Sequence, residues 1–258
     1  MKLTILGCSG GIGAGLRTTA MLLDDDVLID AGTGVGDLTQ DEMARIDAVF
    51  LTHSHVDHIC SLPLLADAVG GRRQAPVTIY ALEATIDALR IHLFNNCLWP
   101  DFSVLPSVDA PYLRYQVVKP GVTVQIGKRR ITPLPASHTV PTVGYWMDSG
   151  VASLVFTGDT GPCDALWEAV NAIDNLRYLI IETSFAEQDC HIAKASQHLC
   201  PSLLAGELAR LRLPAEIFIT HLKPHDSAAT VAEIGRLLPD LPADRPLRML
   251  SRRQVLAF

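Results

Sequence analysis

The 258-residue sequence has no uninterrupted apolar run long enough to cross a membrane. A membrane-spanning helix needs about 18 or more consecutive apolar residues, whereas the apolar stretch at residues 79–99 contains Glu83, Asp87, Arg90 and His92. The first residues follow a strand-like pattern and lack the apolar region and small-residue cleavage site of a secretory signal. We therefore expect a soluble, cytoplasmic protein without a membrane partner.

The sequence also lacks closely spaced cysteine pairs. Its six cysteines are scattered along the chain without a CxxC motif, at Cys8, Cys60, Cys97, Cys163, Cys190 and Cys200. Because neither a paired spacing nor an export signal is present, we expect these cysteines to be reduced and mostly buried. Cys60 and Cys200 lie near histidine-containing motifs, so a thiolate metal ligand or nucleophile is the alternative for these two residues.

Positive charge is scarce. The 21 Lys and Arg residues against 28 Asp and Glu residues give a net charge of −7, which repels polyanions in general. The short basic runs at residues 72–73, 128–130 and 252–253 are typical of a solvated surface. Nucleic acid is therefore a poor candidate for a partner, and a small substrate is favoured.

Low-complexity segments and long flexible linkers are missing as well, so we expect one domain over residues 1–258. Strand-like runs in clusters of two or three alternate with single helical stretches, which favours two mixed β-sheets packed face to face. The predicted fold is an α/β four-layer αββα sandwich of two similar halves, with a seam near Pro133, Leu134 and Pro135. The expected strands cover residues 3–6, 20–23, 27–30, 48–51, 77–80, 112–118, 123–126, 131–134, 143–147, 153–157, 178–182, 216–220 and 255–258, and the expected helices cover residues 58–69, 83–95, 164–173, 201–211 and 227–238.

Glycines are frequent after the first expected strand, at residues 10–15, but they do not form a dinucleotide-binding loop. The GxGxxG spacing fails at Leu16, and the segment leads into a strand pattern rather than a helix. We expect no nucleotide cofactor there.

The most informative motif is His53-Ser54-His55-Val56-Asp57-His58, an HxHxDH pattern after the expected strand 48–51. Four ligand-capable side chains so close together can hold two cations side by side. His53 and His55 can share one cation, while Asp57 and His58 can bind a second about 3.5–4 Å away. The motif predicts a dinuclear metal site of a hydrolytic enzyme.

Three later residues follow strand-like apolar runs and can complete the two coordination spheres. His138 is expected to complete one site and His221 the other, while Asp159 bridges both cations. Taken singly, a His or Asp after a strand is usually a turn or hydrogen-bonded loop residue. Together with the HxHxDH motif, however, these residues are predicted as metal ligands.

The motifs resemble those of the metallo-β-lactamase superfamily over nearly the whole chain. The matching residues are Asp30 in the segment 28–32, the motif at 53–58, and His138, Asp159 and His221. The resemblance implies a metallo-β-lactamase fold with a dinuclear site at one edge, in which Asp30 supports the histidine loop. Within the superfamily, the segments 55–62, 92–100, 182–185 and 196–201 are most similar to class II cyclic nucleotide phosphodiesterases. Val56 and Cys200 depart from the leucine and threonine usual in that group.

This resemblance implies hydrolysis of a small phosphodiester such as 3′,5′-cyclic AMP or GMP. Two divalent cations, zinc as the first expectation and manganese or iron as alternatives, are expected to share a hydroxide that attacks phosphorus in line. Asp57 is expected to bind metal and orient the hydroxide. His198 is expected to bind the phosphate or protonate the leaving alkoxide, its alternative being a hydrogen-bonded histidine at a helix start. His92, His191 and His225 are expected to be structural.

Other readings remain open at this point. An arylsulfatase or a tRNA 3′-processing endonuclease of the same superfamily would share the ligands, although a basic arm for tRNA is not evident. A non-catalytic metal-binding protein or a diiron redox protein is the alternative from another class. Phe94, Asn95, Asn96 and Trp99 could either stack on a purine or end an amphipathic helix packed in the core. A homodimer is compatible with the sequence, but no apolar stripe indicates one.

Overall fold

The computed structural model describes residues 1–239 and 243–258. Its strands are β1 (Lys2–Gly7), β2 (Ala20–Leu23), β3 (Val27–Ala31), β4 (Ala48–Phe50), β5 (Val77–Ala81), β6 (Leu113–Val117), β7 (Val124–Ile126), β8 (Arg129–Pro135), β9 (Val143–Asp148), β10 (Ser153–Phe156), β11 (Leu176–Glu182), β12 (Glu216–Thr220), β13 (Leu247–Met249) and β14 (Val255–Ala257). Its helices are α1 (Gln40–Ala44), α2 (Val56–Ile59), α3 (Leu62–Gly70), α4 (Glu83–His92), α5 (Asp164–Val170), α6 (Cys190–Ser196), α7 (Pro201–Leu208) and α8 (Ser227–Leu237), with short 3-10 helices η1 (Thr33–Asp37) and η2 (Glu187–Asp189).

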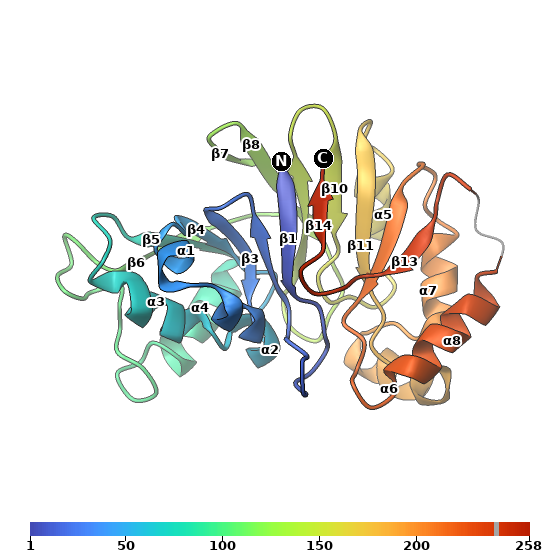
Figure 1. Ribbon diagram of the computed structural model, residues 1–258, viewed down its shortest axis with the longest axis horizontal. Coiled ribbons are helices and arrows are strands. Elements are labelled where there is room, and N and C mark those ends of the chain that lie inside the picture. The colour runs from blue at the N-terminus through green and yellow to red at the C-terminus, as the bar shows by residue number, and fades with distance from the viewer. Residues whose placement is uncertain (240–242) are drawn as a thin grey trace.

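Within the described residues, these strands form two seven-stranded sheets. Their orders are β14-β1-β2-β3-β4-β5-β6 and β13-β12-β11-β10-β9-β8-β7. Strands β3 to β6 run parallel to one another, as do β10 to β13, and the remaining neighbours are antiparallel. Both sheets are therefore mixed, as predicted. Figure 1 shows the sheets at the centre, with α1, α3 and α4 on one side and α5, α7 and α8 on the other.

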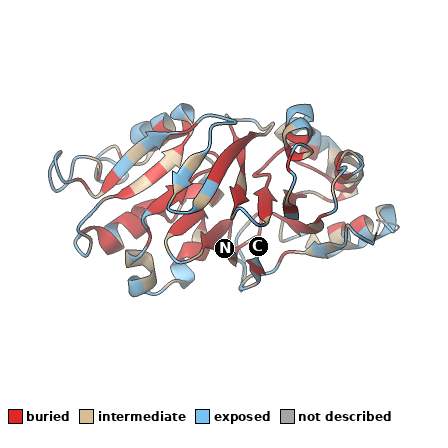
Figure 2. Cartoon of the chain, turned by 90° about the horizontal axis from the view of Figure 1, so that it is seen from above, coloured by how far each residue is buried: buried red, intermediate tan, exposed pale blue. Residues whose placement is uncertain are grey.

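Three apolar layers separate the four layers of secondary structure. Alternate residues of β3 illustrate them, since Leu28 faces the layer under the first set of helices while Val27 and Ile29 face the space between the sheets. The second sheet places Val155 against its own helices and Phe156 between the sheets. This period of two is what a strand buried on both faces requires. Figure 2 shows the buried strands as the interior and the exposed helix faces outside. The predicted αββα sandwich is confirmed.

The expected strands are all present, but some elements differ from the prediction. The expected helix 58–69 is two helices, because Pro63 lies in the first turn of α3, where a missing N–H is tolerated, and a new helix begins there. The short strand β13 and the helices α1 and α6 were not expected, since each is too short for a clear periodic pattern. Among the described residues, no helix combines the length and apolar character that a bilayer crossing requires.

The chain passes from the first sheet to the second between β6 and β7, upstream of the seam expected near Pro133 and Pro135. Those prolines belong to β8, where Pro133 pairs with Tyr145 and Pro135 with Val143. Pro133 and Pro135 thus lie within a paired strand, not at the crossing between the sheets.

The parallel strands end at one edge of the sandwich. Asp30 lies at the end of β3, the HxHxDH motif follows β4, and Glu182 ends β11. Strand β8 has the same direction as β10, because each is antiparallel to β9. The segments after β8, β10 and β12 consequently meet the segment after β4 at this edge, where α2 begins (Figure 1).

One ion pair links the two sheets at the opposite end of β3. Arg129, at the start of β8, forms a bidentate pair with Asp26 between β2 and β3, with 2.7 Å from Nη2 to Oδ2, and reaches Asp24 at 3.4 Å. The hydrogen bond from Arg129 lowers the pKa of Asp26 from its ordinary 3.8. The pair is partly exposed, so we expect it to stabilise the fold by only about 1 kcal/mol.

We predict that Arg129→Met lowers the free energy of unfolding by about 1 kcal/mol at pH 7. Because the folded pKa of Asp26 is depressed, this stabilisation is present above the unfolded value and disappears as pH falls through the folded value. Urea unfolding at pH 7 and near pH 3 measures the difference, with Lys128→Met at the neighbouring exposed position as control. An equal loss at both pH values would contradict the prediction.

Candidate metal centre

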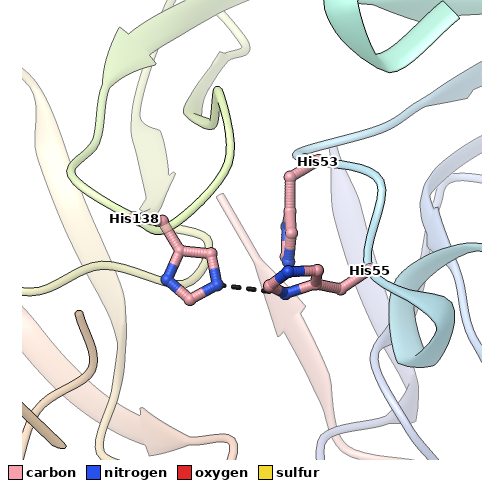
Figure 3. Close-up of side chains that lie close together, drawn as sticks. All are labelled: His53, His55 and His138. Atoms are coloured by element: carbon pink, nitrogen blue, oxygen red, sulfur yellow. Dashed lines mark hydrogen bonds between the residues drawn. The ribbon is translucent and has the colours of Figure 1, made fainter. Parts of the chain in front are cut away.

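The predicted donor residues converge at the edge where the strands end. His53, His55, Asp57 and His58 lie in the β4–α2 segment, and the distant partners follow other strands: His138 after β8, Asp159 after β10 and His221 after β12. Figure 3 shows that His53 and His55 approach His138 from the opposite segment. His138 Nε2 is 3.1 Å from His55 Nδ1. Residues more than eighty positions apart are thus brought within direct contact.

Two groups of donor atoms can be distinguished. His53, His55 and His138 form one group, and Asp57, His58 and His221 form the other. Asp159 lies between them, because its Oδ2 is 3.8 Å from His53 Nε2, 3.3 Å from His58 Nε2 and 3.3 Å from His221 Nε2. Within the second group, His221 Nε2 is 3.2 Å from Asp57 Oδ2. A carboxylate in this position can contact cations held by either group.

The distances between the donor atoms match those around a shared metal ion. Zinc-to-nitrogen bonds of 2.0–2.1 Å in a tetrahedron imply donors about 3.3 Å apart, which the separations of 3.1–3.8 Å bracket. His53 Nε2 is buried and has no hydrogen-bond partner among the described residues. An orphaned buried nitrogen is costly unless it is a ligand. Both observations support metal binding by these residues.

Asp30 orients two of the imidazoles from behind. Its Oδ2 accepts a hydrogen bond from His58 Nδ1 at 2.7 Å, and its carboxylate accepts the Thr52 hydroxyl hydrogen at 2.9–3.1 Å. Because that hydrogen goes to Asp30, Thr52 Oγ1 can only accept from His53 Nδ1, 2.9 Å away. Both rings therefore direct Nε2 toward Asp159, the arrangement typical of metal-binding histidines.

Unusual backbone conformations accompany this packing. Asp30 and His221 have positive φ angles of 57° and 65°, a region that non-glycine residues seldom adopt and that Asp and His tolerate better than most. Two glycines permit close approach of chain segments: a Cβ at Gly10 would lie 2.4 Å from the His221 carbonyl oxygen, and one at Gly32 would lie 2.3 Å from that of Asp57. Gly10, in the glycine-rich segment after β1, thus packs against the edge that carries the donor residues, and this close approach explains why a glycine stands there.

Burial and nearby charges favour, for most donors, the protonation state that can bind a metal, which is a neutral imidazole or an ionised carboxylate. Burial lowers the pKa of His53 well below its ordinary value and also lowers those of His55 and His138, so these imidazoles are neutral. Burial opposes ionisation of Asp159, but electrostatic attraction to the neighbouring His221 and His58 imidazoles holds the pKa of Asp159 well below its usual value. The pKa of His58 is raised despite burial, because the negative charges of Asp159 and Asp30 lie on either side. The same negative charge attracts a divalent cation.

His198 lies beside both donor groups. Its ring centroid is 4.7 Å from that of His138 and 5.5 Å from that of His221. Its Nδ1 is 2.6 Å from Oε1 of the fully buried Glu182. Although burial acts in the opposite direction, the charge of Glu182 raises the pKa of His198. Pro201 begins α7 immediately beyond this segment, as the sequence suggested.

Other predicted residues lie outside the donor groups. His92, His191 and His225 are exposed and join none of the groups. Phe94 is buried among the residues under α3 and α4, and Trp99 packs against the same cluster. Asn95 Oδ1 accepts backbone hydrogen bonds from Cys97 and Leu98, and Asn96 Oδ1 accepts one from Asp101. These four residues build the end of α4 and its following turn, so the core alternative fits them better than base stacking.

The expectation of reduced, mostly buried cysteines is wrong. Cys190 and Cys200 form a disulfide, with Cα atoms 5.3 Å apart, and of the six cysteines, all described, only Cys200 is buried. The turn between α6 and α7 brings these two residues together, which their spacing of ten residues did not indicate. A thiolate role for Cys200 is therefore ruled out in this state, and Cys60 belongs to no donor group among the described residues.

Several residues of the site were missed or left without a role. Glu182 and Ser184 follow the apolar strand β11, so a polar pair after a buried strand was the available signal. Thr52 precedes the HxHxDH motif directly. The Gln197 carbonyl accepts a hydrogen bond from His138 Nδ1 at 3.0 Å, which leaves His138 Nε2 free for a metal. No sequence signal marks a backbone carbonyl for this role.

Comparisons with known proteins agree with this geometry. Residues 26–239 match the family described as Beta-lactamase superfamily domain. The chain therefore belongs to the β-lactamase superfamily, and it is a metal-dependent hydrolase. The expected family and fold are thus confirmed.

The relatives of this chain include proteins named as cyclic nucleotide phosphodiesterase and proteins named as ribonuclease Z. A "Probable 3′,5′-cyclic-nucleotide phosphodiesterase" of Yersinia pestis is 27% identical over 276 residues, which span 86% of this chain and 78% of that protein. A "Ribonuclease Z" of Pyrobaculum neutrophilum is 30% identical over 259 residues, with 86% of each chain covered. The crystal structure of unliganded yeast PDE1 superposes with a TM-score of 0.83 at 17% identity, covering 100% of this chain and 99% of that one. The expected resemblance to cyclic nucleotide phosphodiesterases is confirmed.

We predict that Asp159→Ala abolishes paired metal binding, because both donor groups lose the carboxylate between them. Elemental analysis after zinc loading and gel filtration should give two equivalents for the wild type and at most one for the variant. Asp174→Ala, at an exposed position, is the control and should match the wild type. Full metal content in Asp159→Ala would show that the carboxylate is not a shared ligand.

Proposed function

We propose that the protein is a dinuclear metal-dependent phosphodiesterase that hydrolyses a small phosphodiester, with 3′,5′-cyclic nucleotides as the first candidates. The observation that carries this proposal is the position of His198, which lies beside both donor groups and whose Nδ1 is bound to Glu182. His198 also forms a further set of potential donor atoms with His138 and Asp159, and we assign it to the substrate rather than to a metal. Hydrolysis of a phosphodiester needs charge neutralisation at phosphorus and a proton for the leaving alkoxide. The site provides candidates for both.

The metal ligands in this proposal are His53, His55 and His138 for one cation and Asp57, His58 and His221 for the other, with Asp159 between them. Zinc is the first candidate, because imidazole and carboxylate ligands suit it, and manganese and iron are the alternatives. When bound, the cations supply Lewis-acid chemistry and neutralise charge on a phosphate ester. Asp57, which is partly exposed, would also orient the attacking water through its carboxylate.

His198 is the proposed general acid. Glu182 Oε1 accepts the hydrogen of His198 Nδ1, so that Nε2 is the nitrogen left to act on a substrate. The raised pKa of His198, which follows from the Glu182 charge, increases the protonated fraction near neutral pH. A 3′-alkoxide is a poor leaving group without a proton, and Nε2–H can provide one. Glu182 acts here as a positioning residue.

An open surface depression next to His138 offers room for a small substrate body. About 480 Å³ of space lies beside His138, lined by Leu82, Thr139, Val140, Pro141 and Thr142 among others. This volume is within the usual range for small-molecule sites. Apart from His138, its lining is apolar or bears hydroxyl groups and contains no acidic side chain and no Lys or Arg, so it suits a sugar or base better than a polyanion.

A tRNA 3′-processing nuclease is the second candidate, favoured by the similarity to the Pyrobaculum neutrophilum ribonuclease Z. Such a nuclease has to bind a polyanion, whereas this chain carries a net charge of −7. An arylsulfatase is a further alternative, because its sulfate ester substrate would present similar oxygens to the same metal ligands. A non-catalytic metal-binding protein or a diiron redox protein would show no ester hydrolysis.

We predict that purified protein loaded with zinc or manganese hydrolyses 3′,5′-cyclic AMP or GMP and bis-(p-nitrophenyl) phosphate. The same panel includes p-nitrophenyl sulfate and a precursor tRNA, with product formation measured by chromatography. Cleavage of the precursor tRNA alone would replace the cyclic nucleotide assignment by the nuclease. Hydrolysis of the sulfate ester alone would indicate an arylsulfatase.

We predict that His198→Ala slows turnover by roughly 10²–10⁴-fold while leaving the metal content intact, because the proposed acid is not a ligand. Rates on 3′,5′-cyclic AMP, whose leaving group is an alkoxide, and elemental analysis measure the two effects on one preparation. His225→Ala changes an exposed histidine outside the site and serves as the control. Loss of metal in His198→Ala would show that this histidine is a ligand.

A further inference from the structure

Ser184 joins a metal-donor histidine to the proposed general acid. Its side chain is 1% exposed. Its Oγ lies 2.9 Å from His221 Nδ1, 3.1 Å from His198 Nδ1 and 3.0 Å from Glu182 Oε2. Two imidazoles and one carboxylate therefore share a single hydroxyl group, which has only one hydrogen to donate. The direction of that hydrogen decides how the imidazoles are protonated.

The hydrogen-bond donors around Glu182 determine the direction in which the Ser184 hydroxyl hydrogen points. Oε1 faces the Thr160 backbone N–H at 3.1 Å and His198 Nδ1 at 2.6 Å, and Oε2 faces the Leu199 backbone N–H at 3.3 Å. Donors thus surround the group as they do an ionised carboxylate, which only accepts. If the Ser184 hydrogen pointed elsewhere, two oxygen lone-pair groups would face each other 3.0 Å apart. Ser184 therefore donates to Glu182.

This direction assigns the hydrogen of His221. Since the Ser184 hydroxyl hydrogen is used by Glu182, its oxygen can only accept from His221, so Nδ1 of His221 carries the hydrogen. The other ring nitrogen, Nε2, is then the one left to bind a metal. That nitrogen lies 3.2 Å from Asp57 Oδ2 and 3.3 Å from Asp159 Oδ2, among the metal donors.

The first sheet contains the same arrangement. There Asp30 contacts His58 directly and His53 through the Thr52 hydroxyl. In the second sheet, Glu182 contacts His198 directly and His221 through the Ser184 hydroxyl. Each sheet thus provides one buried carboxylate that orients one imidazole itself and another through a hydroxyl group. The repetition argues that the Ser184 contacts are a functional arrangement rather than incidental packing.

We propose that Ser184 is a positioning residue that, together with Glu182, holds His221 in the Nδ1–H tautomer and so prepares its Nε2 for metal binding. The link to His198 rests on the proposed function, since it makes one carboxylate responsible for both the acid and a metal ligand. The tautomer itself concerns only His221. Second-sphere contacts of this kind typically change metal affinity by about 10–100-fold.

The test uses the metal-free and zinc-loaded full-length protein. Carbon-13 labelling of histidine side chains reports which ring nitrogen carries the hydrogen, and the His221 signal is identified by its loss in His221→Gln. Zinc affinity is measured by competition with a chromophoric chelator. We expect Nδ1 of His221 to carry a hydrogen in both forms of the wild type. In Ser184→Ala we expect a mixture of tautomers, with the more weakly held zinc bound about 10–100-fold less tightly.

Two variants serve as comparisons. Ser184→Thr retains the hydroxyl and should restore the wild-type affinity and tautomer. Ser153→Ala removes a buried serine hydroxyl that has no partner among the described residues, and it should change neither readout. Wild-type zinc affinity in Ser184→Ala would overturn the proposal. So would the Nε2–H tautomer in the metal-free wild type, a result that needs no variant to fold. Neither readout uses a substrate, so failure of cyclic nucleotide hydrolysis is a separate outcome.

Discussion

The arrangement of the donor residues depends on one carboxylate, that of Asp159, which is buried among imidazoles. Asp159 is 2% exposed, and its Oδ2 lies within 3.8 Å of nitrogens from three histidines. A buried carboxylate is costly unless positive charge compensates it. His53, His58 and His221 are each held from behind by a hydrogen bond at Nδ1 that directs Nε2 inward. A bound cation would supply positive charge at Asp159 without disturbing these hydrogen bonds.

The two sheets make this concentration of polar groups possible. Their parallel strands end at the same edge, so loops after β4, β8, β10 and β12 meet without any of their polar residues entering the apolar layers. The apolar layer between the sheets lies behind the centre and keeps the strand ends in register. Backbone strain at Asp30 and His221 is the local cost of aiming side chains at a common point.

Substrate choice depends on features outside the donor groups. Relatives named as cyclic nucleotide phosphodiesterase and ribonuclease Z match this chain at similar identity, so the similarity alone does not distinguish a small ester from a polynucleotide as the substrate. What differs between such substrates is charge and size. The proposed preference for a small ester rests on the open depression beside His138 and on the excess of acidic residues in this chain.

Sequence alone was sufficient for the fold class, the strands and the donor residues. The donors are recognisable because HxHxDH concentrates four ligands locally, while His138, Asp159 and His221 each follow an apolar run whose end marks a sheet edge. The strands are recognisable because burial on one or both faces leaves a periodic pattern. Both signals are local, so they can be read without knowing which segments meet.

Only the tertiary structure decided which groups orient those donors. Several contacts join segments whose sequences do not indicate which other segment they meet. These are the contacts of Glu182 and Ser184 with His198 and His221, of the Gln197 carbonyl with His138, and of Cys190 with Cys200. It also assigned Phe94 to the core rather than to a binding surface. Hydrogen bonds and disulfides depend on distances of a few ångström between atoms, and folding alone determines these distances.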